Sequence, residues 1–185
     1  MPKLQVLAIA AAGALASLPV AADTPPEPKA LAQRACSLNG RWCVDWQAAS
    51  PGRARVETVR VTEQPAEKKA NTGWSASIRI LGSLAITNDG ACVIDLATSS
   101  NLLPRETKPE DPAFVFHCNG STARVLSLGQ FITDFESLPR STSHRVWAES
   151  FGLDEHDRLV VHTKEGRKVL IDPHTGKAVQ GSFAR

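Results

Sequence analysis

Tight glycine-containing turns between short apolar runs constrain the fold of this chain more than any other feature of its sequence. The dipeptides that mark these turns are Asn39-Gly40, Asp89-Gly90, Asn119-Gly120 and Glu165-Gly166. Asn-Gly and Asp-Gly are favoured in two-residue loops between antiparallel strands, because both loop positions require a positive φ. Valine, isoleucine, threonine and aromatic residues are frequent in the flanking runs, as they are in strands. The pattern predicts a chain built from β-hairpins.

The first turn also predicts how the cysteines pair. If Asn39-Gly40 forms a type I′ loop, Cys36 and Cys43 lie directly opposite each other on the two strands of a hairpin. Opposed strand residues have Cα atoms about 4.5–5.5 Å apart, a separation that a disulfide spans. Cys92 and Cys118 then pair by elimination. We therefore expect two disulfides.

Other roles for the cysteines fit their spacing less well. Zinc sites and thioredoxin-like redox sites use closely spaced CxxC pairs, and the gaps in this chain are longer. His117 adjoins Cys118, but neighbouring residues of a strand point to opposite faces of the sheet. We expect no catalytic cysteine, no metal site and no cofactor.

The N-terminal segment predicts export. Lys3 precedes an apolar run over residues 4–18, and Val20-Ala21-Ala22 supplies the small residues that signal peptidase recognises. An uncleaved anchor is the alternative, but the run is short and rich in alanine for a spanning helix. We expect a signal peptide over residues 1–22, no stable membrane anchor after cleavage, and a periplasmic or secreted bacterial protein. Disulfides are typical of those compartments.

Charge argues against two classes of partner. The 185 residues carry a formal net charge of only +2, which gives no general attraction to nucleic acid or to an anionic membrane. The densest basic group, Arg53, Arg55 and Arg60, alternates with valines and contains no aromatic residue. We interpret it as the solvated face of a strand.

The segments between the hairpins differ in composition. Residues 23–35 form a Pro-rich leader that we expect to be flexible. A strand is predicted over residues 74–81, and a long charged loop over residues 98–112. Phe131, Ile132, Phe135 and Leu138 recur at helical spacing, which predicts a short amphipathic helix over residues 131–138 that packs on a sheet.

The C-terminal third predicts an up-and-down meander. Setting Lys164 opposite Arg167 places Val161 opposite Leu170 and Val160 opposite Ile171. Both faces of that hairpin are then apolar, as in a strand that is buried on both sides. Such a meander resembles one blade of a propeller or part of a barrel wall.

These elements together predict an all-β fold for residues 36–185, as a single domain held by two disulfides. We expect mainly antiparallel hairpins and meanders in a sandwich-like arrangement, with the short helix at its side. A barrel or a partial propeller is the alternative, because a complete propeller needs at least four blades.

The tryptophans allow two interpretations. Trp42, Trp46, Trp74 and Trp147 all fall on predicted strands. They either pack in the core or form an aromatic platform for a sugar or a protein, since tryptophan is enriched at binding hot spots. Together with Arg105 and Lys108 of the charged loop, they are our candidate binding surface.

Catalytic signatures are absent from the sequence. It contains no G-x-S-x-G, no HExxH, no Walker loop and no Rossmann glycine pattern. Carboxylates gather at Glu149, Asp154, Glu155 and Asp157, but their spacing does not fit a calcium-binding EF-hand loop. We interpret this group as a solvated turn, and the five histidines are not spaced as metal ligands. We expect no catalytic residues and no enzymatic activity.

The expected function follows from these exclusions. An exported, disulfide-bonded domain without catalytic motifs favours a periplasmic binding or inhibitory module, such as an immunity-type protein or an enzyme inhibitor. We expect it to contact a protein partner in the cell envelope. One alternative is a structural or accessory envelope protein. Another is a hydrolase whose residues assemble only in three dimensions, which predicts a pocket of carboxylates with perturbed pKa values.

Overall fold

The computed structural model describes residues 32–47, 56–64, 73–98 and 101–179, and these residues form small antiparallel sheets. Sheet A contains β1 (Ala32–Cys36), β2 (Trp42–Gln47), β3 (Val56–Glu63) and β4 (Ser75–Arg79). Sheet B contains β5 (Ser83–Ile86), β6 (Cys92–Leu96), β8 (Pro112–Cys118) and β9 (Ser121–Ser127). Sheet C pairs β7 (Leu102–Pro104) with β10 (His144–Val146). Sheet D contains β11 (Ala148–Leu153), β12 (Leu159–Thr163), β13 (Lys168–Asp172) and β14 (Lys177–Ala178).

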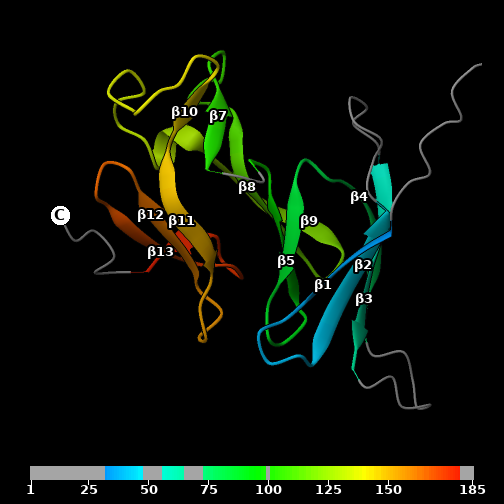
Figure 1. Cartoon of the computed structure of the whole chain (residues 1–185). Helices are drawn as coiled ribbons and strands as arrows, with labels where there is room; N and C mark the ends of the chain where they lie inside the picture. Colours follow the sequence, from blue (N-terminus) through cyan, green and yellow to red (C-terminus); the bar gives the residue numbers. More distant parts are fainter. Residues whose placement is uncertain (1–31, 48–55, 65–72, 99–100, 180–185) are drawn as a thin grey trace, which may run out of the picture.

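Sheet B forms the middle layer of the molecule. Figure 1 shows it in green, between sheet A in blue and cyan and sheet D in yellow to red. Val93 and Ile94, neighbours on β6, belong to different core clusters because successive strand residues point to opposite faces. The cluster between sheets A and B contains Val44, Val59, Val61, Ile78, Leu84, Ile86 and Val93. The cluster beside sheets C and D contains Ile94, Phe114, Phe116, Trp147, Leu159, Val161 and Ile171.

Burial on both faces belongs to sheet B rather than to the C-terminal hairpin. On β8, five consecutive residues from Ala113 to His117 are buried, and β6 shows four buried residues in a row. On β12, buried residues alternate with half-buried ones, so the prediction for that hairpin is wrong. Its second face has no further sheet to cover it among the described residues.

The register of the same hairpin also differs by one residue. Val160 pairs with Leu170 and Val161 with Val169, because the loop contains three residues instead of two. Gly166 donates its N–H to the Thr163 carbonyl and has a φ of 79°. This combination is the turn-plus-bulge geometry of three-residue hairpin loops. Only the last loop residue then needs a positive φ, and here that residue is Gly166.

The type I′ loop predicted for Asn39-Gly40 is found instead at Asn119-Gly120, where the sequence predicted a tight turn. Asn119 has a φ of 50° and Gly120 of 83°, and Cys118 pairs with Ser121 across them. In the Asn39-Gly40 turn only Gly40 has a positive φ, so that loop is of another type. The cysteines nevertheless face each other there as predicted.

Both disulfides are confirmed. Cys36 bonds to Cys43 and Cys92 bonds to Cys118, with Cα separations of 4.0 and 4.1 Å. Each bond joins residues that are directly opposed on neighbouring strands. The first bond closes the β1–β2 hairpin, and the second ties β6 to β8 across the β7 excursion.

The predicted helix over residues 131–138 is wrong. The helical geometry of the described residues is limited to one 3-10 turn, η1 (Leu128–Gln130), and residues 131–138 follow it as turns and bends. Phe131, Ile132 and Leu138 are buried in the core and Phe135 packs against it. The apolar spacing therefore identified residues that are buried, although not in a helix.

Two other segments are more regular than expected. β7 lies within the predicted 98–112 loop and pairs with β10. β1 begins at Ala32, so residues 32–35 belong to sheet A and not to the leader. The predicted signal peptide, the remainder of the leader, Arg53 and Arg55 lie outside the described residues.

The predicted all-β, antiparallel fold class is confirmed. The described sheets stack face to face, and none of them closes into a barrel. Each of sheets A, B and D is a four-stranded meander, the unit that a propeller repeats around an axis.

Candidate functional site

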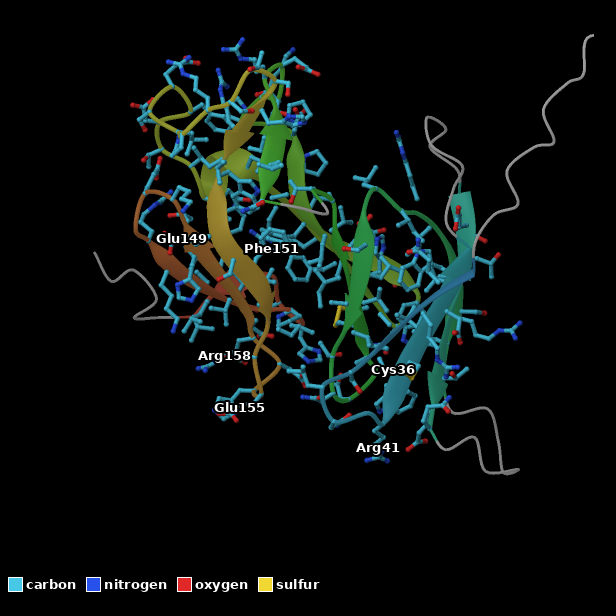
Figure 2. The ribbon with its side chains drawn as sticks, in the orientation of Figure 1. Cys36, Arg41, Glu149, Phe151, Glu155 and Arg158 are labelled. Carbon is cyan, nitrogen blue, oxygen red and sulfur yellow. A yellow bond between two sulfur atoms is a disulfide. The ribbon has the colours of Figure 1, made fainter. Side chains whose placement is uncertain are left out.

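Turns from three sheets meet at one end of the stack. Figure 2 shows the β1–β2 turn with Arg41 and the β11–β12 turn with Glu155 and Arg158 at the same end of the molecule. The β5–β6 turn, which contains Asn88 and Asp89, is hydrogen-bonded to both of them. We call Asn39, Asn88, Asp89, Asp157 and His174 the turn cluster.

Hydrogen bonds join these turns directly. Asn39 donates its backbone N–H to Oδ1 of Asn88 over 2.8 Å, and its Nδ2 to the Asn88 carbonyl over 3.0 Å. Asn88 in turn donates its backbone N–H to Oδ1 of Asp157 over 2.7 Å. Residues from sheets A, B and D are thereby tied together.

The same local geometry shapes the first two turns. Thr87 donates its hydroxyl to Asp89, and Asp89 accepts the backbone N–H of Ala91. Ser37, Asn39 and Arg41 make the equivalent bonds in the β1–β2 turn. Short polar side chains that bond to nearby backbone groups favour such turns, so the carboxylate of Asp89 is fixed in place by its own turn.

His174 connects the turn cluster to a disulfide. Its Nε2 lies 3.3 Å from Oδ2 of Asp89, and its Nδ1 lies 3.5 Å from Sγ of Cys92. The neighbouring carbonyl of Pro173 lies 3.7 Å from Sγ of Cys118. The β13–β14 turn of sheet D thus covers the bond that joins β6 to β8 in sheet B.

The carboxylates of the cluster differ in their pKa values. Burial acts to raise the pKa of Asp89, but the hydrogen bonds from Thr87 and Ala91, and the charge of His174, hold that pKa below its ordinary value. Burial raises the pKa of Asp157, and the nearby charge of Asp89 raises it further. The carboxylate with the lowered pKa, Asp89, is thus the one in contact with His174.

The two cysteines of the Cys92–Cys118 disulfide differ in exposure. Cys92 is completely buried, whereas Cys118 is partly exposed.

The tryptophans mainly fill the core. Trp147 is fully buried and Trp46 is 7% exposed, so neither provides an accessible platform. Trp42 and Trp74 are half-buried and hold Gly90 between sheets A and B: Trp74 donates its Nε1–H to the Gly90 carbonyl over 3.0 Å. Their position favours packing over ligand recognition.

Arg105 and Lys108 are exposed, in the segment that follows β7. The segment is closed by local bonds, because Lys108 and Asp111 are hydrogen-bonded to each other through backbone and side chain. The structure does not bring either cation together with a tryptophan as a single surface, so their role in binding stays a prediction.

The acidic residues between positions 149 and 157 take part in separate ion pairs. Asp154 pairs with Arg158 at 2.7 Å, and Glu149 pairs with Lys164 at 3.4 Å. Figure 2 shows Glu149 far from Glu155 along the β11–β12 hairpin. Over the described ranges, no group of three or more His, Cys, Asp or Glu side chains could hold a metal ion.

Asp95, a fully buried carboxylate, closes a turn. It accepts the backbone N–H groups of Leu81 and Gly82 over 2.6 and 2.9 Å. Burial raises its pKa, and these two hydrogen bonds act in the opposite direction. Asp95 therefore fixes the connection between β4 and β5.

β9 is the exposed edge of the middle sheet. It is the last strand of sheet B, and all residues from Ser121 to Val125 are exposed. Val125, an apolar residue of this strand, has 53% of its surface exposed. An edge strand presents backbone N–H and C=O groups that have no partner within its sheet.

Sequence reasoning identified the disulfide but missed its histidine. His117, the neighbour of Cys118, is hydrogen-bonded to Thr122, and burial lowers its pKa. His174 lies 82 residues from Cys92 in a Pro/Gly turn, and no local pattern links the two. Only the stacking of sheet D on sheet B brings them together.

Comparison with known proteins finds no matching family model, and no curated protein or solved structure with significant similarity to this chain. The described part of the chain contains no helix long and apolar enough to cross a membrane. Two disulfides without a free cysteine in the same residues are consistent with an extracellular or secreted protein.

Proposed function

We propose that this chain is an exported binding module that contacts a protein partner through the free edge of β9. The observation that carries the proposal is the exposure of residues 121–125 on a terminal strand of the middle sheet. An extended segment of another protein can add to such an edge, because main-chain hydrogen bonds supply affinity and neighbouring side chains supply specificity.

β9 is better suited to this role than β5 or β14. β5, at the opposite edge of sheet B, contacts β1 and β2, and β14 has only two residues. β9 has seven residues and, although it does contain Arg124, it contains no proline, lysine or acidic residue. Those are the residues with which exposed edges usually avoid pairing.

A bulge determines where a partner strand would pair. His117 pairs with Thr122 and Phe116 with Arg124, so Ala123 is an extra residue in β9. A bulge bends its strand and interrupts regular pairing. The added strand therefore pairs along residues 124–126, next to the exposed side chain of Val125, because the Ser127 N–H is already donated to Oε1 of Gln130.

The compartment supports an inhibitory or immunity-type role. The two disulfides, together with the signal peptide predicted over residues 1–22, favour the bacterial periplasm or the secreted fraction. A stapled scaffold that offers a fixed strand edge binds without first ordering a loop, which lowers the entropic cost of association.

The test is capture from a bacterial envelope extract. The mature chain, residues 23–185 with a C-terminal tag, is purified without reductant, and mass spectrometry identifies what it binds. We expect one stoichiometric partner whose capture falls at least about tenfold in Val125→Lys, since a lysine on the edge opposes strand addition.

Ser77→Lys provides the matched control. Ser77 is an exposed residue of β4, the terminal strand of sheet A, so the variant adds the same charge to another sheet edge. It should capture the partner as the unmodified chain does. Equal capture by Val125→Lys would refute the β9 proposal, and a broad set of partners unaffected by either change would favour the accessory envelope role.

A further inference from the structure

We propose that the Cys92–Cys118 disulfide is a thiol–disulfide exchange site, in which His174 stabilises the departing Cys92 thiolate while an incoming protein dithiol reduces the bond. The supporting contacts run from Asp89 through His174 to the disulfide: Oδ2 of Asp89 lies 3.3 Å from Nε2 of His174, and Nδ1 of His174 lies 3.5 Å from Sγ of Cys92. A carboxylate on one ring nitrogen orients the imidazole, so that its other nitrogen faces the sulfur.

Exposure determines the direction of attack. Cys92 is completely buried and Cys118 is half-buried, so the proposal places the attack of the incoming thiolate at Sγ of Cys118. Sγ of Cys92 is then the leaving group. It is also the sulfur beside His174, and thiolates next to a protonated histidine leave more readily.

The exchange balances in two steps. The first thiol of the dithiol loses its proton to solvent and attacks Sγ of Cys118, which forms a mixed disulfide and breaks the Cys92–Cys118 bond. The electron pair of that bond goes to Sγ of Cys92, which takes a proton from Nδ1 of His174. The second thiol of the dithiol then loses its proton to solvent and attacks the first sulfur of the same dithiol, which closes the dithiol's own disulfide and releases Cys118 as a thiolate. Cys118 and the imidazole of His174 each take up a proton from solvent, so the net transfer from the dithiol to this chain is two electrons and two protons.

Charged groups from several elements lie around His174. Asp89 lies against its ring, and the charges of Asp157 and His174 also interact. Asp172 accepts the backbone N–H of His174 within the same turn. On the other side of this turn, the side chain of Arg124 covers Gly176, and it is the cation that β9 contributes.

The Cys36–Cys43 disulfide provides an internal reference for the reactivity of Cys92–Cys118. Cys36 and Cys43 also face each other on neighbouring strands, but no histidine contacts either sulfur among the described residues. A difference that depends on His174 should therefore appear at one bond only. General loosening of the fold would affect both.

The first test follows the reduction of both bonds by dithiothreitol, a small dithiol, at neutral pH. Free thiols are trapped by alkylation at successive times and are assigned by peptide mass spectrometry. We expect His174→Gln to slow reduction of Cys92–Cys118 by about tenfold relative to Cys36–Cys43. A destabilised fold would accelerate reduction instead, so an unchanged or increased ratio would overturn the proposal.

The second test observes the thiolate itself. Cys118→Ser leaves Cys92 as a free thiol beside His174, and the ultraviolet absorbance of the thiolate is followed against pH. The titration should occur at lower pH in Cys118→Ser than in Cys118→Ser/His174→Gln, because only the first variant keeps the imidazole beside the sulfur. Coinciding titrations would show that His174 merely packs against the sulfur.

Discussion

Gly90 controls the contact between sheets A and B through its own backbone. Its φ is 72°, and a Cβ at this position would lie 2.2 Å from Cδ2 of Trp42. The conformation and the packing both require glycine, because other residues adopt a positive φ at a cost and have no space for the added atom. Trp74 completes the contact with its bond to the Gly90 carbonyl.

Gly90→Ala should therefore lower the free energy of unfolding by about 3 kcal/mol, which combines backbone strain with overpacking. Gly166→Ala is the matched control, since Gly166 has a φ of 79° but nothing within 4 Å of an added Cβ. We expect that control to cost only about 1 kcal/mol. Urea unfolding measures both, and equal losses would show that Trp42 moves aside.

The residue scale also shows what the sequence could predict of the site. Cys36–Cys43 followed from hairpin register, and Cys92–Cys118 from elimination. The contact of His174 with Cys92 depends on how two sheets stack, and no periodicity or spacing along the chain encodes that distance.

At the scale of elements, the segment after η1 explains why a helical pattern did not produce a helix. Asp134 accepts the backbone N–H groups of Glu136 and Ser137 through its own side chain. Glu165, from the β12–β13 hairpin, accepts those of Thr133 and Asp134. Side-chain acceptors thus replace the backbone acceptors of a helix, while the apolar residues stay buried.

Glu165→Ala should release this segment and lower the free energy of unfolding by about 2 kcal/mol at neutral pH, because hydrogen bonds to a charged acceptor are lost. Glu155→Ala is the control: Glu155 is an exposed carboxylate whose side chain is 86% accessible. Denaturant unfolding of the two variants should show little loss for the control.

The effect of Glu165 should also depend on pH. Burial acts to raise the pKa of Glu165, but the hydrogen bonds from Asp134 and Thr133 and the charge of Arg167 hold that pKa below its ordinary value. The native state thus binds the proton less readily than the unfolded chain, and the stabilisation is present above the unfolded pKa of about 4.3. It should disappear as the pH falls through the folded pKa; a constant difference between Glu165→Ala and the unmodified chain over that range would contradict this account.

Hairpins were the elements most predictable from sequence. The Asn119-Gly120 loop adopts the expected positive φ at both positions. The Glu165-Gly166 loop does not, since it uses three residues and shifts the register by one. The dipeptide determines that a turn forms, whereas the flanking residues decide its length.

At the scale of the whole molecule, the all-β class was predictable and the stacking order was not. Apolar runs on β6 and β8 predict burial on both faces only after their partners are known. The C-terminal hairpin carries a similar pattern, yet it lies at the outside of the stack and is buried on one face. Position within the stack distinguishes them.

The two disulfides should contribute unequally to stability. Cys92 and Cys118 are 26 residues apart in sequence, and Cys36 and Cys43 only seven. A longer closed loop removes more entropy from the unfolded chain. The Cys92–Cys118 disulfide should therefore contribute about 1 kcal/mol more to stability than Cys36–Cys43. Paired alanine variants of each bond, compared by thermal or urea unfolding, measure this difference, and a larger loss for Cys36→Ala/Cys43→Ala would contradict it.

Amide hydrogen exchange of β9, with and without the captured partner, tests the central claim most directly. Strand addition protects main-chain N–H groups, whereas a contact made only by side chains does not. We predict that amides within residues 124–126 exchange more slowly in the complex, while those of β4 stay unchanged. Protection elsewhere on the surface, with unaltered exchange along β9, would contradict the proposal that this edge is the binding site.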